Sequence, residues 1–338
     1  MTDPAEDPYI CVGVCVPDAE EAYCLGCGRP WGTPGLPSSI HVIERGWLSS
    51  NNVLLYDGNQ ATLIDSGYVG HAPRTVELVK SALAGRRLAR LINTHSHSDH
   101  IGGNAALQRE FGCAILIPAG IEEHIANWDE QALLLTPAAQ RGDRFRHDGV
   151  LRPGETLRMG GLDWRAHAAP GHDMDALVFH CPAARLLISG DALWEDGFGI
   201  IFGELLGQPG ALAATRETLD MIAGLDVATV IPGHGKPFSD VRAALARAYQ
   251  RLAAFEADPG RMARNGIKAC FIFNLLDMQG LPLAELEPYL ASVPFFREVG
   301  ACHLGMDVPA LAAWLLSELK KAGAVEERDG RLLPTAAA

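Results

Sequence analysis

The 338-residue sequence predicts an α/β protein with a mainly helical C-terminal part. Short apolar runs bounded by Gly, Asp or Pro indicate strands, and stretches of helical periodicity lie between several of them. Strands that alternate with helices are typical of a layered α/β domain. The strand pattern stops after Pro237, and mainly helical patterns follow. We therefore divide the chain into a Cys-rich segment (1–35), an α/β domain (36–240) and a C-terminal helical domain (241–338).

The elements of the α/β domain follow from their apolar patterns. Strands are predicted where apolar residues form short runs, at 52–56, 61–64, 88–92, 114–117, 177–180, 186–188 and 227–231. Helices are predicted where apolar residues recur every three or four positions, at 72–84, 104–111 and 211–225.

The C-terminal region begins with a predicted helix over 241–257, with Ser239 as its expected N-cap and its end at the Asp-Pro-Gly triplet 258–260. A second amphipathic stretch covers 308–322, and the Asp-Gly pair 329–330 is expected to turn a closing hairpin. Helices followed by a small hairpin resemble a winged helix. Because these helices carry few basic residues, we expect packing or formation of a homodimer rather than DNA binding.

The charge of the chain limits its partners. The formal net charge is −13 at pH 7, which disfavours binding to nucleic acid or anionic lipid, because like charges repel. No apolar run approaches the ~20 residues of a membrane helix, and the N-terminus is acidic where a secretory signal would be basic. We expect a cytoplasmic protein that acts on a small-molecule substrate.

The densest group of potential metal ligands is the loop THSHSDHIGG at 94–103. It follows an apolar strand and contains His95, His97, Asp99 and His100 within six residues. If His95 and His97 keep an extended spacing, they project to one side and can hold one ion, while Asp99 and His100 face a second position. Imidazole and carboxylate donors suit Zn²⁺, Fe²⁺, Mn²⁺ or Co²⁺. The alternative, a polar loop with incidental histidines, fits this density of ligands poorly.

Three more candidate ligands stand at the ends of predicted strands or loops. His172 and His234 each follow a Pro-Gly pair, and Asp191 follows an apolar strand. A single His after Pro-Gly is usually a surface turn residue. Together with the 94–103 loop, however, these residues predict a shared metal centre.

These motifs resemble the metallo-β-lactamase superfamily, and the 94–103 loop is close to the pattern of glyoxalase II. The loop matches the HxHxDH signature, and LIDSG (63–67), APGH (169–172), SGD (189–191) and IPGHG (231–235) match other family motifs in order. The resemblance implies a four-layer αββα sandwich. It also implies two divalent ions, Zn²⁺ by preference or Fe²⁺ or Mn²⁺, with these ligands: His95, His97 and His172 for one, Asp99, His100 and His234 for the other, and Asp191 as a bridge.

The resemblance further implies hydrolysis by a hydroxide held between the two metals, with Asp99 as a proton shuttle. Asp65 is expected to orient a ligand imidazole, with a simple turn aspartate as the alternative. His97 stands where flavo-diiron oxygen reductases carry an acidic residue, which disfavours redox chemistry. We expect an ester, thioester or lactone substrate. The alternatives are a phosphodiesterase or nuclease and, from another class, a non-catalytic partner-binding module.

Candidate substrate-binding residues lie near the predicted metal centre and in the C-terminal part. Trp194, Phe198 and Phe202 either line an apolar pocket beside Asp191 or belong to the core. Glyoxalase II binds the anionic glutathione moiety with basic and tyrosine side chains, for which this chain offers Arg247, Tyr249, Arg251, Arg261, Arg264 and Lys268. None of these matches a family motif, so the sequence leaves glutathione specificity open.

The eight cysteines form two groups. The N-terminal group resembles a small Cys-rich family of predicted iron–sulfur proteins and provides thiolates for Zn²⁺ or an iron–sulfur cluster: Cys11, Cys15, Cys24 and Cys27. Unligated thiols are the alternative. The scattered group is expected to be buried as small hydrophobes: Cys113, Cys181, Cys270 and Cys302.

Overall fold

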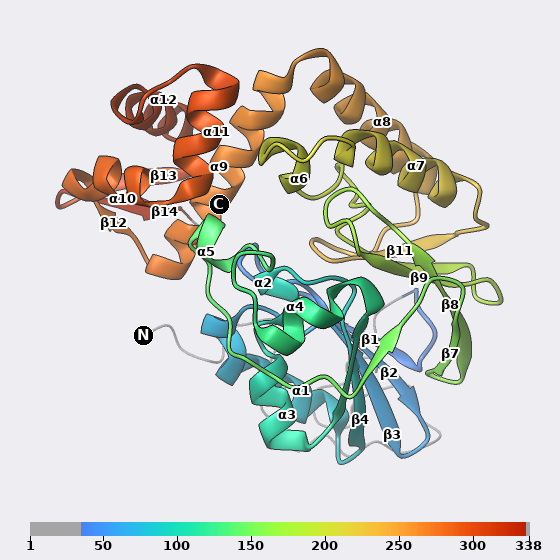
Figure 1. Cartoon of the computed structure of the whole chain (residues 1–338). Coiled ribbons are helices and arrows are strands. Elements are labelled where there is room, and N and C mark those ends of the chain that lie inside the picture. Colours follow the sequence, from blue (N-terminus) through green and yellow to red (C-terminus); the bar gives the residue numbers. More distant parts are fainter. Residues whose placement is uncertain (1–34, 336–338) are drawn as a thin grey trace.

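The computed structural model describes residues 35–335 of the chain (Figure 1). Within this range, two sheets pack face to face, and helices cover the outer side of each sheet. This arrangement confirms the predicted αββα layers. The C-terminal helices, orange to red in Figure 1, extend from one end of the sandwich.

The first sheet is mixed and has the strand order β1-β2-β3-β4-β5-β6. β1, β2 and β3 pair antiparallel, and the pairs from β3 to β6 are parallel. Its strands are β1 (Ile40–Ile43), β2 (Asn52–Asp57), β3 (Gln60–Ile64), β4 (Arg87–Ile92), β5 (Ala114–Pro118) and β6 (Gly149–Leu151). The connections carry η2 (Val69–His71), α1 (Ala72–Leu83), α2 (Ser98–Ile101), α3 (Asn104–Phe111), η3 (Ala119–Ile121), α4 (Glu122–Asn127) and α5 (Leu135–Ala138). Because β3 and β4 are parallel, the loops that follow them meet at one edge.

The second sheet has the strand order β11-β10-β9-β8-β7. Its strands are β7 (Thr156–Met159), β8 (Leu162–Ala168), β9 (Leu177–Cys181), β10 (Leu186–Gly190) and β11 (Thr229–Pro232), with α6 (Phe202–Leu205) and α7 (Ala211–Ala223) between the last two. The sequence prediction lacks β7 and β8. In β8, the buried Trp164 and Ala166 alternate with Asp163 and Arg165, which is the pattern of a strand with one buried face rather than a continuous apolar run.

Apolar packing holds these layers together. Side chains such as Ile64 of the first sheet and Phe179 of the second form the core between the sheets. α1 and α3 cover the other face of the first sheet through Val79 and Leu107, and α7 and α8 cover the second sheet. Since each fully buried large apolar side chain stabilises the fold by about 1.5–3 kcal/mol, this packing fixes the loops at the end of the sandwich relative to one another.

The C-terminal part contains helices and a small sheet of order β12-β14-β13. Its elements are α8 (Val241–Ala257), α9 (Pro259–Met278), β12 (Leu281–Pro282), η4 (Leu283–Glu285), α10 (Leu286–Ser292), α11 (Pro294–Leu304), α12 (Val308–Lys321), β13 (Val325–Arg328) and β14 (Arg331–Pro334). The predicted closing hairpin is thus present. The likeness to a winged helix stays a prediction. No single described helix is long and apolar enough to cross a membrane; α11 and α12 together would be, but they bend by 93° at their junction.

The start of α8 differs from the prediction. Asp240, not Ser239, is the N-cap, and its carboxylate accepts the backbone N–H of Ala243 at 3.1 Å. An N-cap residue lies directly before the first helical residue. A carboxylate at that position also interacts favourably with the positive end of the helix dipole. Asp258 caps α9 in the same way and Pro259 is its first residue, so the Asp-Pro-Gly triplet both ends α8 and begins a helix that the prediction lacks.

Candidate metal centre

The seven predicted ligands meet at one end of the sandwich, where loops from both sheets converge. The 94–103 loop follows β4, while His172 lies between β8 and β9. Asp191 directly follows β10, and His234 follows β11. They form two groups in which the ligand atoms of each lie within 4.8 Å of one another. Gly233 has to be small, because a Cβ there would clash with the Asp191 carboxylate.

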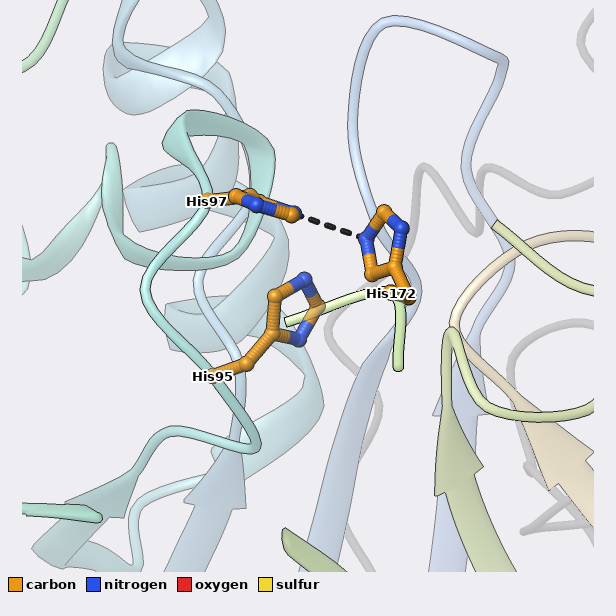
Figure 2. Close-up of side chains that lie close together, drawn as sticks. All are labelled: His95, His97 and His172. Atoms are coloured by element: carbon orange, nitrogen blue, oxygen red, sulfur yellow. Dashed lines mark hydrogen bonds between the residues drawn. The ribbon is translucent and has the colours of Figure 1, made fainter. Parts of the chain in front are cut away.

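The first group consists of three imidazoles, His95, His97 and His172 (Figure 2). His97 Nδ1 lies 2.7 Å from His172 Nε2. The other nitrogen of His172 lies 2.5 Å from the Ile200 carbonyl oxygen, so Nδ1 donates and the Nε2 lone pair faces the group. His95 Nε2 is buried and has no hydrogen-bond partner among residues 35–335. Such an unpaired atom costs about 1–3 kcal/mol, whereas three converging imidazole lone pairs fit a divalent cation.

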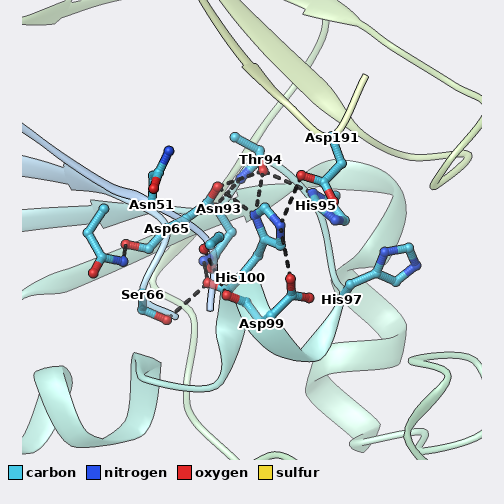
Figure 3. Close-up of polar contacts among 12 residues, drawn as sticks. Asn51, Asp65, Ser66, Asn93, Thr94, His95, His97, Asp99, His100 and Asp191 are labelled. Carbon is cyan, nitrogen blue, oxygen red and sulfur yellow. Dashed lines mark hydrogen bonds and ion pairs between the residues drawn. The ribbon is translucent and has the colours of Figure 1, made fainter. Parts of the chain in front are cut away.

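The second group combines two carboxylates with two imidazoles: Asp99, His100, Asp191 and His234. His100 Nε2 lies 3.7 Å from Asp99 Oδ2 and 3.4 Å from Asp191 Oδ1 (Figure 3). His234 Nε2 lies 3.0 Å from Asp99 Oδ2. Asp191 Oδ2 is also 3.4 Å from His172 Nε2 in the first group. One carboxylate therefore faces both groups, as a bridging ligand would.

Asp65 orients His100 from behind, through a positioning contact that the sequence suggested (Figure 3). Its Oδ2 lies 2.8 Å from His100 Nδ1, and its two oxygens accept the backbone N–H and the hydroxyl of Thr94, each at 2.8 Å. The imidazole thereby keeps its Nδ1 proton and turns Nε2 towards the carboxylates. Asp65 has a φ of 58°, a left-handed backbone conformation that is strained for a residue other than Gly.

The electrostatics of the centre favour a bound positive charge. Burial lowers the pKa of His95 well below its ordinary value, with the neighbouring imidazoles adding to the effect. Burial and His172 lower the pKa of His97 to about 4. Burial raises the pKa of Asp191, but His100 and His234 outweigh it and hold this pKa well below its ordinary range. Neutral His95 and His97 beside ionised Asp191 are in the protonation states that metal ligation requires. Burial lowers the pKa of His100, but Asp191, Asp65 and Asp99 outweigh it and raise this pKa well above its ordinary value, so a bound cation would have to displace the proton on Nε2.

A cavity of about 50 Å³ opens over both groups. Besides the ligands, its lining residues are Trp47, Gln140, Trp194, Ile200, Phe202, Ala269, Cys270 and Phe273. Trp194 and Phe202 thus line a pocket, whereas Phe198 is only 1% exposed and packs in the core. The sequence did not single out Trp47 or, within the C-terminal part that it proposed for substrate binding, the residues from α9. These residue types are common in any core and reach the centre only through tertiary packing.

Two tryptophans flank His234. The indole centroids of Trp47 and Trp194 lie 5.2 and 5.3 Å from the His234 ring, and the two indoles meet edge to face at 5.7 Å. Trp194 Nε1 also donates to Asp191 Oδ1 at 3.2 Å. The pair therefore shields this side of the centre from water and helps to hold the carboxylate that faces both groups.

The basic and tyrosine side chains considered for an anionic substrate lie elsewhere. Arg247, Arg251 and Arg264 contact Asp196 (3.3 Å), Asn265 (2.8 Å) and Asp258 (2.8 Å), respectively. Tyr249 donates to Asp220 at 2.6 Å, and Lys268 lies 4.0 Å from Glu318. None of these side chains, nor that of Arg261, lines the cavity as far as the structure describes the chain.

The structure describes four of the cysteines, of which three are buried and one is exposed. The predicted N-terminal site of Cys11, Cys15, Cys24 and Cys27 lies outside the described residues. Cys113, Cys181 and Cys270 are buried, as predicted. Cys302 is exposed on α11, so the prediction of a buried side chain is wrong there. Val299 and Gly300 of the same helix are buried, while Ala301 and Cys302 lie on its exposed face.

The sequence of this chain is similar to a known protein family and to several relatives. The family model described as "Metallo-beta-lactamase superfamily" matches residues 45–234. A hydroxyacylglutathione hydrolase of Anaeromyxobacter dehalogenans is 30% identical over 254 residues, covering 71% of this chain and 88% of that protein. One of Acidiphilium cryptum is 28% identical, covering 77% and 94%. Other matches are partial: the chain spans 38% of the length of the Hyphomonas neptunium hydroxyacylglutathione hydrolase and 44% of one from Rhodopseudomonas palustris.

Solved structures agree on the fold. A metallo-beta-lactamase family protein from Thermus thermophilus superposes with a TM-score of 0.54 at 19% identity, covering 89% of this chain and 100% of that one. The metallo-beta-lactamase FEZ-1 of Legionella gormanii has a TM-score of 0.54 at 14% identity, covering 66% and 94%. At such identities the likeness concerns the fold alone.

Proposed function

Because this chain belongs to the metallo-β-lactamase superfamily, we propose that it is a metal-dependent hydrolase that cleaves an ester, thioester or lactone bond of a small molecule at a centre of two divalent ions. The observation that carries this proposal is the Asp191 carboxylate, which lies 3.4 Å from His172 Nε2 on one side and 3.4 Å from His100 Nε2 on the other. A thioester also agrees with the names of the relatives, which are hydroxyacylglutathione hydrolases.

The proposed ligands divide between the ions as the two groups do. His95, His97 and His172 would hold one ion, and Asp99, His100 and His234 the other, with Asp191 shared. Zn²⁺ is our first choice, and Fe²⁺ or Mn²⁺ would suit the same donors. When bound, two such ions supply a water of lowered pKa and polarise the substrate carbonyl.

Asp99 is the proposed proton acceptor. Burial raises its pKa, but His100 and His234 outweigh this effect, so the carboxylate is ionised at neutral pH. It lines the cavity, and its Oδ2 lies 3.0 Å from His234 Nε2. Asp99 can therefore take a proton from the attacking water and later deliver it to the leaving group. Meanwhile Trp47 and Trp194 keep bulk water from this side of the centre.

An acyl substrate fits the cavity better than a phosphodiester. Cleavage of a phosphodiester is helped by cationic side chains that stabilise charge on the phosphoryl oxygens. Within residues 35–335, no Lys or Arg lines the cavity. Neutral carbonyl compounds bring no charge into the cavity, whereas a phosphodiester anion would depend on the proposed ions alone for compensation of its charge, so the acyl proposal stands first.

Metal analysis combined with a substrate panel tests the proposal. The protein is stripped with a chelator and reloaded with Zn²⁺, Fe²⁺ or Mn²⁺, and then assayed on esters, thioesters, lactones and bis-p-nitrophenyl phosphate. We expect about two ions per chain, acyl hydrolysis that disappears on chelation, and recovery on reloading. A variant with Cys11, Cys15, Cys24 and Cys27 changed to Ser separates any metal at the N-terminal segment from the main centre. Fully loaded protein that is inert on every acyl compound would contradict the proposal.

A further inference from the structure

The walls of the cavity above the metal centre are apolar and aromatic. Trp47 and Trp194 stand beside His234, and the Phe202 ring lies 5.2 Å from the His97 ring on the opposite flank. α9 closes the cavity with Ala269, Cys270 and Phe273. Burial raises the pKa of Cys270 to about 12, so its thiol is neutral. Gln140, a neutral amide, is the polar group between these walls, and it accepts the Ser98 hydroxyl at 2.6 Å.

Three arginines of the C-terminal helices that could receive an anionic substrate group are engaged elsewhere. Arg247 and Arg251 on α8 and Arg264 on α9 contact acidic or amide partners and do not line the cavity. A charged group buried without a partner in an apolar pocket is strongly destabilised. The described walls therefore offer no compensation to a carboxylate that enters with the substrate.

The neighbouring hollow offers no compensation either. On the far side of Gln140 lies an open hollow of about 530 Å³, lined in part by Glu130, Arg141 and Asp143. Arg141 already donates to the Asp277 carboxylate, with Nε and Oδ2 2.9 Å apart. An anionic substrate tail that crossed Gln140 would thus meet two carboxylates and a guanidinium that is already paired.

We infer that the substrate carries uncharged, apolar groups on both sides of its scissile acyl bond, and that anionic compounds such as glutathione thioesters are rejected. This inference rests on the proposed function, because it names the substrate class of the same site. It separates this chain from its relatives named hydroxyacylglutathione hydrolases while keeping the metal centre in common.

Matched substrate pairs test the inference on the metal-loaded full chain. On the acyl side, p-nitrophenyl butyrate and mono-p-nitrophenyl succinate share the leaving group and differ by a methyl against a carboxylate. On the thiol side, S-lactoylglutathione is compared with S-lactoyl-N-acetylcysteamine. We expect kcat/KM to favour the uncharged member of each pair by at least about 100-fold. Equal or reversed rates would overturn the inference and leave the proposed function standing. If neither member of any pair reacts, the proposed hydrolysis is itself wrong and the inference falls with it.

A charge placed on the wall provides a second test. Ala269 is partly exposed on the cavity side of α9, so Ala269→Arg adds a cation without removing a core side chain. We expect the preference for butyrate over succinate to shrink at least about tenfold, mainly through KM of the succinate ester. Ala301→Arg on the exposed face of α11 is the matched control and should leave the preference unchanged. If Ala269→Arg is folded and metal-loaded but keeps the full preference, the wall does not select by charge. The wild-type substrate pairs decide the matter even if this variant fails to fold.

Discussion

The cavity has two parts that different interactions hold in place. We call the part formed by the seven proposed ligands the metal half, and the part formed by Ala269, Cys270 and Phe273 of α9 the wall. In the metal half, polar side chains at the strand ends are fixed by hydrogen bonds, as Asp65 fixes Thr94 and His100 at 2.8 Å. The wall consists of apolar or neutral side chains on a helix that packs against α8 and α11. On the proposed function, the sandwich would carry out bond cleavage, and the helix laid over it would contribute to substrate selection together with Trp47, Trp194 and Phe202. The two halves should therefore respond to separate changes.

The largest effect is expected from Asp191→Ala, because this carboxylate faces both ligand groups. We expect kcat/KM to fall by at least about a thousandfold, together with a loss of bound metal. Steady-state kinetics and elemental analysis measure the two effects. Asp163→Ala, at an exposed aspartate of β8, is the control and should change neither. A fully active Asp191→Ala protein would remove the basis for placing the chemistry in the sandwich.

Asp65→Asn should have the next largest effect. The amide keeps the size of the side chain but has one acceptor oxygen, so it cannot accept both the Thr94 backbone N–H and the His100 Nδ1–H, which contact different oxygens of the carboxylate. We expect metal affinity or activity to fall by about 10–100-fold. Competition with a chromogenic chelator measures the affinity. An unchanged affinity would mean that Asp65 serves only to form the turn after β3.

A substitution in the last turn of α9 should reduce the stability of the wall and leave metal binding by the metal half unchanged. Asp277 accepts the Tyr68 hydroxyl and Arg141 Nε, each at 2.9 Å, and thus ties α9 to the loops of the sandwich. Asp277→Ala should lower the free energy of unfolding by about 1–2 kcal/mol, because it leaves the Tyr68 hydroxyl without this partner. Tyr68→Phe keeps the contact between Arg141 and Asp277 but removes a hydroxyl that also accepts the Arg141 backbone N–H at 3.1 Å, so it should cost about as much. Urea denaturation measures both variants, and metal content should stay constant; a parallel loss of metal would show that the halves are not separable.

The smallest effect concerns pH and a histidine remote from both halves. Burial lowers the pKa of His167 in β8, with His180 and Arg165 adding to this, and its Nε2 has no hydrogen-bond partner within the described chain. The unfolded chain therefore binds a proton at this histidine more tightly than the folded chain does. The free energy of unfolding accordingly decreases as pH falls through ~6.5, the ordinary pKa of histidine. His167→Phe should lose less stability than wild type between pH 7.5 and 5 in urea titrations. Equal losses would contradict this assignment, and kcat/KM at pH 7.5 should not change.

The sequence predicted the metal half far better than the wall. Within the 94–103 loop, spacing alone places His95 and His97 on one side, so a local motif carries the geometry. Apolar runs likewise predicted a layered α/β domain, whereas its four-layer αββα arrangement was implied by the resemblance of the motifs to the family. Phe202 and Phe198, in contrast, lie close together in sequence, yet one lines the cavity and the other packs in the core. Local sequence cannot distinguish them, because long-range packing decides which side chain faces the opening.

Since α9 supplies walls to the cavity and no proposed ligand, its partly exposed cavity residue Ala269 can be exchanged without removing a proposed ligand or a core side chain. On the proposed function, related enzymes could thus differ in substrate specificity through a few side chains of one helix, such as Ala269 or Phe273, while they keep the same metal-binding loops. Protein engineering can use the same separation. A library of variants restricted to the cavity side of α9 would vary substrate specificity while the proposed metal centre stays unchanged.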